Sequence, residues 1–184
     1  MSKFKNKYTI KSARLKGYDY SQSGMYFITI CVKDRKYFLG EVTNEKMILS
    51  EIGKIAEQFW REIPRHFPSI KLDQHQIMPN HLHGIVQILY NQADSVETQR
   101  CCVSKSNTFY HLKPGSLPVA IRSFKSIVAK TAHKKFPIIK FNWQAGFYDR
   151  IIRNETELNK IREYIQNNPK MWEQDADDTG NIFI

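Results

Sequence analysis

Two histidines separated by one residue, His81 and His83, have a spacing suited to metal chemistry. They open the apolar run HLHGIVQILY, which has the composition of a β-strand. Side chains two residues apart on a strand share a face, so both imidazoles can point at one object while Leu82 packs on the opposite face. Two neutral imidazoles at this spacing can hold a divalent metal ion. Two half-buried histidines that only form hydrogen bonds would show the same spacing, and this alternative stays open.

A second pair of candidates, Tyr164 and Asn168, lies on a helix near the end of the chain. Leu158, Ile161 and Ile165 form the apolar stripe of that helix, and the pair falls side by side on its border. The tyrosine can then keep its hydroxyl near an edge, and the amide oxygen one turn later can serve as a third metal ligand. A core tyrosine followed by an asparagine that ends the helix before a proline is the alternative.

The strands that must position these side chains follow from short runs of apolar and β-branched residues. A turn-rich stretch at 43–45 predicts a small hairpin. The predicted strands are Met25–Lys33, Ile70–Met78, His81–Tyr90 and Ile138–Trp143, the last extended by Phe147–Ile152.

Three helices are predicted from apolar residues at helical spacing. The first is capped by Ser50 and closed by Pro64. A second, basic helix runs from Pro118 to about Lys135, and its predicted apolar side is Ala120, Phe124, Ile127, Val128 and Thr131. The third begins after Asn154 and is stopped by Pro169.

This order, β-α-β-β-α-β with one extra helix, predicts an α+β fold of the ferredoxin-like or RRM-like kind. Its antiparallel sheet would carry helices on one face, and the C-terminal helix would carry the candidate tyrosine. With 184 residues, the chain is expected to form a single domain over 1–184. Around its core we expect a basic arm at 1–16, a long loop at 91–117 and an acidic tail at 173–184.

The charge of the chain favours a polyanionic partner. Twenty-eight Lys and Arg against eighteen Asp and Glu leave a net charge of +10, which suits nucleic acid before a membrane. No apolar run approaches the roughly 18 residues of a membrane span, and the N-terminus lacks the apolar segment of a signal peptide. Three cysteines argue against a disulfide framework, so the expected location is cytoplasmic. The expected DNA contacts are Arg14, Lys16, Arg122, Lys125, Lys130 and Lys134.

The combined motifs resemble a known family. The segment IMPNHLHGI (77–85), followed about eighty residues later by IIRNETELNKIREYIQNNPKMW (151–172), closely resembles the single-tyrosine transposases of the HUH endonuclease superfamily. More narrowly, it is similar to the REP-associated branch of the bacterial insertion-sequence tyrosine transposases. The segments 14–42 and 123–130 also look like that family, so the resemblance spans nearly the whole chain.

The resemblance implies a role for each candidate. His81 and His83 match the paired metal-binding histidines, Tyr164 the tyrosine nucleophile, and Asn168 the polar residue that completes the metal site. The implied cofactor is Mg²⁺ or Mn²⁺, and the implied substrate is single-stranded DNA bearing a hairpin. The implied reaction is cleavage and rejoining through a 5′-phosphotyrosine. Whether the protein acts as a monomer or a homodimer stays open.

Other residues compete for these roles. Tyr148 is the rival nucleophile, although a core or base-stacking role suits its place before the last helix better. His75 on the neighbouring strand is expected at the surface or behind the metal ligands. No chemistry is expected of His66, His111, His133, Asp149, Glu157 and Glu163. A non-catalytic module of the same fold that binds single-stranded nucleic acid is the alternative function.

Overall fold

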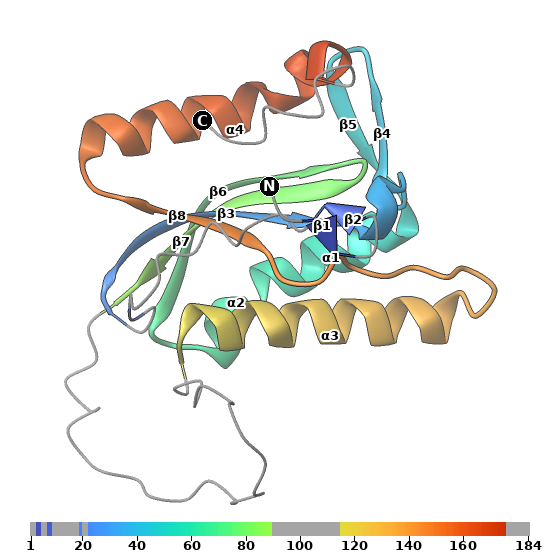
Figure 1. The fold of residues 1–184 in the computed structure, drawn as a ribbon, viewed down its shortest axis with the longest axis horizontal. Helices are drawn as coiled ribbons and strands as arrows, with labels where there is room; N and C mark the ends of the chain where they lie inside the picture. Colours follow the sequence, from blue (N-terminus) through green and yellow to red (C-terminus); the bar gives the residue numbers. More distant parts are fainter. Residues whose placement is uncertain (1–2, 5–6, 9–18, 20–21, 90–114, 176–184) are drawn as a thin grey trace, which may run out of the picture.

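The computed structural model of the chain describes residues 3–4, 7–8, 19, 22–89 and 115–175 (Figure 1). Its strands are β1 (Lys3–Phe4), β2 (Lys7–Tyr8), β3 (Gly24–Cys31), β4 (Gly40–Thr43), β5 (Lys46–Leu49), β6 (Ile70–Met78), β7 (His81–Ile88) and β8 (Tyr148–Ile152). Its helices are α1 (Glu51–Arg61), α2 (Ile63–His66), α3 (Leu117–Lys135) and α4 (Glu155–Asp175). Most of the predicted arm and loop, and the tail beyond Asp175, lie outside the described residues.

Four of these strands form the antiparallel sheet that carries the site, in the order β6-β7-β3-β8. The order and direction are those of a ferredoxin-like domain, so the predicted fold class is confirmed. β3 lies between β7 and β8, with Cys31 opposite His81 and Thr29 opposite both His83 and Tyr148. Directly opposed residues share a face, which places Thr29, His83 and Tyr148 side by side across three strands.

The main hydrophobic core lies between the sheet and the helices α1 and α3, which lie together below the sheet in Figure 1. Ile28 and Ile30 of β3 point into this core, together with Leu82 and Val86 of β7. Trp60 of α1 is fully buried and packs edge-on to Phe124 of α3 at a ring-centroid distance of 5.4 Å. Gly84 gives this indole room, because a Cβ there would overlap its ring.

Helix α4 covers the opposite face of the sheet (Figure 1). Its residues Leu158, Ile161 and Ile165 pack on Phe27 of β3 and Ile85 of β7. The helices therefore lie on both faces of the sheet, with α1 and α3 on one face and α4, which carries Tyr164, on the other.

The predicted helix starts are confirmed to within one residue. The Ser50 hydroxyl accepts a hydrogen bond from the Gly53 N–H at 3.0 Å, and the Asn154 side chain accepts one from the Glu157 N–H at 2.8 Å. Both bonds satisfy amide groups that a helix N-terminus leaves without a helical partner. Pro118 lies in the first turn of α3, where its missing N–H costs nothing.

One predicted helix end is wrong. Pro169 does not stop α4, which continues through it to Asp175. Proline removes the N–H that would bond the carbonyl four residues back, yet packing of the last turns on the body of the protein outweighs that loss. Trp172 supplies this packing, with its ring centroid 5.7 Å from that of Tyr37. The predicted end of the first helix before Pro64 is confirmed: α1 ends at Arg61, and Pro64 lies in the first turn of the separate short helix α2.

The apolar side of α3 differs from the prediction. Ile127 is 38% exposed and Thr131 is only half-buried, whereas Ile121 and Ala132 are buried instead. The buried row of α3 begins at Leu117, one residue before the predicted start, and continues through Ile121 to Ala132. The buried face of the helix is therefore rotated from the predicted one.

Residues 138–143 do not form the predicted strand. Ile138 is 93% exposed, and Trp143 makes one isolated bridge to Val32. The segment leads from the end of α3 toward β8. Its first apolar side chains, Ile138 and Ile139, are exposed, whereas Phe141 and Trp143 are buried in the core. Within 147–152, which was predicted to extend that strand, Tyr148–Ile152 form the separate strand β8 instead.

The small hairpin predicted near residue 44 is formed by β4 and β5. Asn44 and Glu45 connect the strands with positive φ angles of 51° and 59°, which suit a two-residue turn. Within the described part of the chain, no helix combines the length and the apolar character needed to cross a bilayer.

Candidate active site

The two histidines at the start of β7 lie on the α4 face of the sheet, close to each other. Their Nε2 atoms are 2.9 Å apart, and both side chains are almost fully buried. Leu82 between them belongs to the core on the opposite face, as the strand period requires. His81 and His83 therefore point at one place beneath α4.

Each imidazole is held from behind by a buried polar side chain. Nδ1 of His83 lies 2.8 Å from the hydroxyl of Thr29 on the neighbouring strand. Nδ1 of His81 lies 2.7 Å from Oδ1 of Asn80, and this side-chain amide oxygen accepts a hydrogen bond from the ring N–H. With both Nδ1 atoms bonded to the protein, the Nε2 atoms are left to face the space between the rings.

Both imidazoles are neutral at physiological pH. Burial, followed by the positive charge of Arg35, lowers the pKa of His83 to about 3. Burial also lowers the pKa of His81 well below its ordinary value, followed by the effects of His83 and Arg35. Neutral rings with available Nε2 lone pairs are the form in which histidine binds metals.

Tyr164 on α4 completes this group. Its hydroxyl lies 3.3 Å from Nε2 of His83, and the two ring centroids are 5.3 Å apart. Phe27 fixes both rings, because it stacks on the imidazole of His83 and meets the Tyr164 ring edge-on. The predicted tyrosine and histidines are thus brought together by β3, β7 and α4.

Asn168 lies one helical turn after Tyr164, on the side of α4 that faces the histidines. The next turn brings Trp172 over His81 at a ring-centroid distance of 6.0 Å, so Asn168 lies between two residues that contact the pair. Asn168 is 2% exposed, and its Oδ1 has no hydrogen-bond partner within the described part of the chain. A buried amide oxygen without a partner is costly unless another group binds it.

These donors fit a divalent metal. Nitrogens at adjacent octahedral positions lie about 3 Å apart when each bond is about 2.1 Å, close to the separation of the two Nε2 atoms. The oxygen of Asn168 would be the third donor. Among the described residues, no cluster of three His, Cys, Asp or Glu side chains could hold a metal. Two imidazoles and one amide oxygen suit Mn²⁺ better than Mg²⁺, which prefers oxygen ligands.

Ion pairs tie α4 to the sheet on either side of the tyrosine. Arg162 binds Asp73 of β6 through two hydrogen bonds, of 3.0 Å from Nε and 2.6 Å from Nη2. Arg150 of β8 pairs with Glu157 near the start of α4 at 2.8 Å. The helix is therefore anchored to both edge strands of the sheet, which limits how far the tyrosine can move from the histidines.

The competing residues fall in different places. Tyr148 shares the sheet face with His83, and its hydroxyl accepts a hydrogen bond from Gln144 at 3.3 Å. His75 lies on the opposite face, where it pairs with Glu57 at 2.9 Å. His133 bonds the carbonyl of Phe141. The other residues for which no chemistry was expected are Asp149, buried on β8, Glu157 and Glu163 on α4, His66 at the end of α2, and His111, which lies outside the described residues.

The predicted DNA contacts of α3 lie on the far face of the sheet from Tyr164 (Figure 1). Arg122, Lys130 and Lys134 are exposed there. Lys125 instead donates hydrogen bonds to the carbonyls of Gln144 and Gly146, so it holds the segment before β8. Arg14 and Lys16 lie outside the described residues. A strand that touched both α3 and the histidines would have to pass around an edge of the sheet.

Four further residues of the site were not predicted: Thr29, Asn80, Arg35 and Trp172. Asn80 stands in the quoted motif directly before His81, so its position was a usable signal. Thr29 lies on β3 and Arg35 in the turn that follows it. Only the pairing of β3 with β7 brings these two residues near the histidines. Trp172 was excluded by the prediction that the helix ends before Pro169.

Known proteins resemble this chain in sequence and in fold. An uncharacterised protein of Haemophilus influenzae (strain Rd KW20) is 39% identical over 174 residues, covering 90% of this chain and 91% of that protein. A solved REP-associated tyrosine transposase bound to a REP hairpin matches 94% of this chain and 74% of its own, with 18% identity and a TM-score of 0.55.

A crystal structure of a candidate transposase from Deinococcus radiodurans R1 matches 84% of this chain and 95% of its own, with 17% identity and a TM-score of 0.45. No protein-family model matches the chain. The chain belongs to one family with the Haemophilus influenzae protein, and it shares its fold with the REP-associated tyrosine transposase.

Proposed function

We propose that this protein is a metal-dependent tyrosine transposase that cuts and rejoins single-stranded DNA. The observation that carries the proposal is the contact of the Tyr164 hydroxyl with Nε2 of His83, beside the facing Nε2 of His81. A nucleophile must lie next to the group that binds the phosphate it attacks. A module that only binds nucleic acid has no use for this buried arrangement.

In the proposed reaction, the oxygen of Tyr164 attacks the phosphorus of a phosphodiester in line with the departing 3′ oxygen. The new bond is a 5′-phosphotyrosine, the broken bond is P–O3′, and the phenolic proton ends on the released 3′-OH. One phosphodiester replaces another, so a DNA 3′-OH can reverse the step and join a new strand without an energy source.

His81, His83 and Asn168 would hold the Mg²⁺ or Mn²⁺ ion. When bound, that ion would neutralise the negative charge of the scissile phosphate and orient it. Thr29 and Asn80 keep each imidazole turned with Nε2 inward. Arg35 adds a half-buried positive charge beside the pair, which attracts a phosphate to the same place.

We propose hairpin-bearing single-stranded DNA as the substrate. Two observations support it: the net charge of +10, and the fold shared with a transposase that was solved on a REP hairpin. Phosphate contacts position a strand without specifying its bases, so the chain's lysines and arginines would supply affinity and the site would supply chemistry.

A denaturing gel tests the proposal. Purified protein is incubated with end-labelled hairpin DNA and Mn²⁺, as wild type, Tyr164→Phe and Tyr148→Phe. We expect a covalent protein–DNA band in wild type and Tyr148→Phe that disappears with EDTA and with Tyr164→Phe. Cleavage that survives in Tyr164→Phe would assign the chemistry to Tyr148 or to water. Bound but uncut DNA in every lane would favour the non-catalytic binding module.

A further inference from the structure

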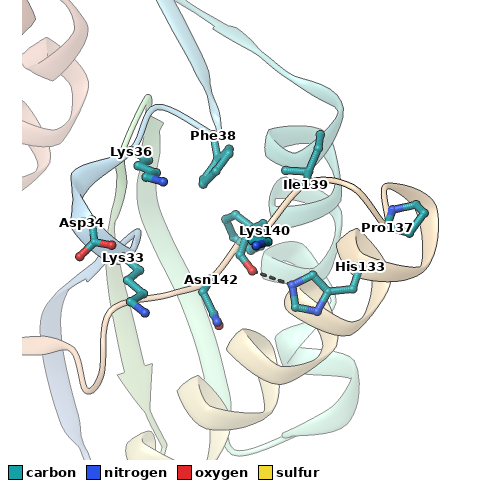
Figure 2. A pocket seen from close by; sticks show the side chains of 10 residues that line it. Lys33, Asp34, Lys36, Phe38, His133, Pro137, Ile139, Lys140 and Asn142 are labelled. Carbon is teal, nitrogen blue, oxygen red and sulfur yellow. Dashed lines mark hydrogen bonds between the residues drawn. The ribbon is translucent and has the colours of Figure 1, made fainter.

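A cavity of about 550 Å³ opens on the surface beyond the end of β3 (Figure 2). One wall is the segment that follows β3, and the other is the segment that leads from α3 toward β8. The volume lies in the range of cavities that bind small organic ligands. Neither the proposed chemistry nor the fold requires a hollow here.

The rim of this cavity is positively charged. Lys33 and Lys36 reach it from one wall and Lys140 from the other, against a single carboxylate on Asp34 (Figure 2). Among the residues that the structure describes, none of the three ammonium groups is engaged in an ion pair. Three ammonium groups around one opening favour an anionic ligand.

The inner part of the cavity is apolar and aromatic. Phe38 is half-buried and meets the buried ring of Phe141 edge-on at a centroid distance of 5.8 Å. Ile139 lies beside them and is 37% exposed. A planar group entering between the lysines would therefore meet an aromatic ring, as a nucleobase does in proteins that bind single strands.

The cavity is connected to the candidate active site through one strained turn. Asp34 and Arg35 both have left-handed φ angles, of 56° and 52°. Such residues are strained unless their surroundings hold them, and they concentrate at ligand sites. Here the turn places Lys33 and Lys36 at the cavity and the charge of Arg35 near His81.

Backbone hydrogen bonds keep both parts rigid. The N–H of Val32 donates to the carbonyl of Asn80 at 2.8 Å, and the N–H of Lys33 donates to the carbonyl of Asn142 at 2.9 Å. The first bond joins the turn to the histidine motif, and the second joins it to the far wall of the cavity. A ligand in the cavity is thus held in a fixed relation to the histidines.

We propose that this cavity binds one nucleotide of the single-stranded DNA whose scissile phosphate lies at Tyr164, with its base on Phe38 and its phosphate on Lys33, Lys36 and Lys140. This inference rests on the proposed function. The combination of anion-binding rim and aromatic floor matches a nucleotide better than a simple anion, which would need no floor. Its connection to the histidines favours a strand over a free nucleotide.

The test measures binding of a DNA hairpin whose single-stranded flanks are lengthened one nucleotide at a time on either side. All proteins carry Tyr164→Phe so that no strand is cut. We expect affinity to rise at one flank length, and Lys36→Ala and Lys140→Ala to remove that rise and to lower the salt slope by about 0.7 each. Phe38→Leu should lower the affinity for the lengthened DNA about fivefold or more. Lys71→Ala, an exposed lysine on β6, is the matched charge control.

A photo-cross-link identifies the contact directly. An iodinated uracil is moved along the same flank, and we expect attachment to Phe38 from one position only. Equal affinities of Lys36→Ala, Lys140→Ala and Lys71→Ala for every flank, or no attachment to Phe38, would overturn the proposal. Deoxynucleoside monophosphate that binds at the cavity and is not displaced by the hairpin DNA would also overturn it, in favour of a free nucleotide.

The covalent-band assay with an intact Tyr164 separates this inference from the proposed function. A covalent band together with unaffected binding by the cavity variants would reject the cavity and keep the transposase. No covalent band, together with the expected loss of binding and the Phe38 attachment, would reject the transposase and keep the nucleotide site.

Discussion

The hydroxyl of Tyr164 lies 3.3 Å from Nε2 of His83, although 81 positions of sequence separate the two residues. The contact follows from the sheet order, because β7 lies in the interior of the sheet and α4 packs across its open face. The hydrophobic contacts of Ile161 and Ile165 fix the rotation of the helix, and that rotation turns the tyrosine toward the histidines.

Removing the hydroxyl of Thr29 should weaken metal binding. We expect Thr29→Val to lower the affinity for Mn²⁺ about 10- to 100-fold, because the imidazole of His83 loses the bond that orients it. Titration calorimetry with Mn²⁺ measures the change, and Thr43→Val on exposed β4 is the control. Equal affinities in the two variants would show that the orientation of His83 does not depend on Thr29.

The amide oxygen of Asn168 should be a metal ligand rather than a helix-terminating group. Asn168→Ala should reduce Mn²⁺ affinity, whereas Asn168→Asp, which keeps an oxygen and adds charge, should retain or raise it. Gln166→Ala, on the exposed side of the same helix, should change nothing. A loss of affinity in Asn168→Asp as large as that in Asn168→Ala would contradict the assignment.

The ion pair between Asp73 and Arg162 should act on chemistry through the placement of α4. Asp73→Asn should slow formation of the covalent band, because the helix that carries Tyr164 loses one of its two anchors. Glu155→Gln is the control, since it removes the more exposed partner of the same arginine. An unchanged rate in Asp73→Asn would mean that packing alone positions the tyrosine.

The same pair predicts a dependence on pH. The hydrogen bond from Arg162 lowers the pKa of Asp73, against the raising effect of burial. A lowered pKa in the folded state stabilises the protein fully above the ordinary value of about 3.9, and the effect is lost as the pH falls through the lowered value. The stability difference between wild type and Asp73→Asn should therefore shrink below about pH 4. A difference in denaturation midpoint that stays constant there would contradict this.

Gly84 tests the packing below the histidines. Gly84→Ala should lower the free energy of unfolding by about 1–3 kcal/mol, because the new Cβ would overlap the buried ring of Trp60. Gly24→Ala on β3 is the matched control, since a Cβ there would make only ordinary contacts. Urea denaturation of both variants measures the difference, and equal midpoints would show that the Trp60 ring relaxes without cost.

Local signals in the sequence were enough to predict most of the helices and strands. The two-residue period of HLH, the cap at Asn154 and the stripe through Leu158 and Ile165 are properties of short segments, and the structure agrees with each. Three of the candidates are in direct contact, and Asn168 lies on the same helix face.

What could not be predicted depends on distant segments. The role of Thr29 needs the register between β3 and β7, and that of Arg35 needs the strained turn after β3. Pro169 was misjudged because its local cost is outweighed by packing of Trp172 against Tyr37 and His81. The segment 138–143 has the composition of a strand, but it meets the sheet in one isolated bridge, between Trp143 and Val32.

Mass spectrometry of the covalent protein–DNA product tests the central claim most directly. Wild-type protein is reacted with hairpin DNA and Mn²⁺, digested with nuclease and protease, and its peptides are sequenced. We expect a nucleotide linked through its 5′-phosphate to Tyr164, and none on any peptide when EDTA is present. A nucleotide on Tyr148, or cut DNA with no modified peptide, would contradict the assignment of Tyr164 as the nucleophile.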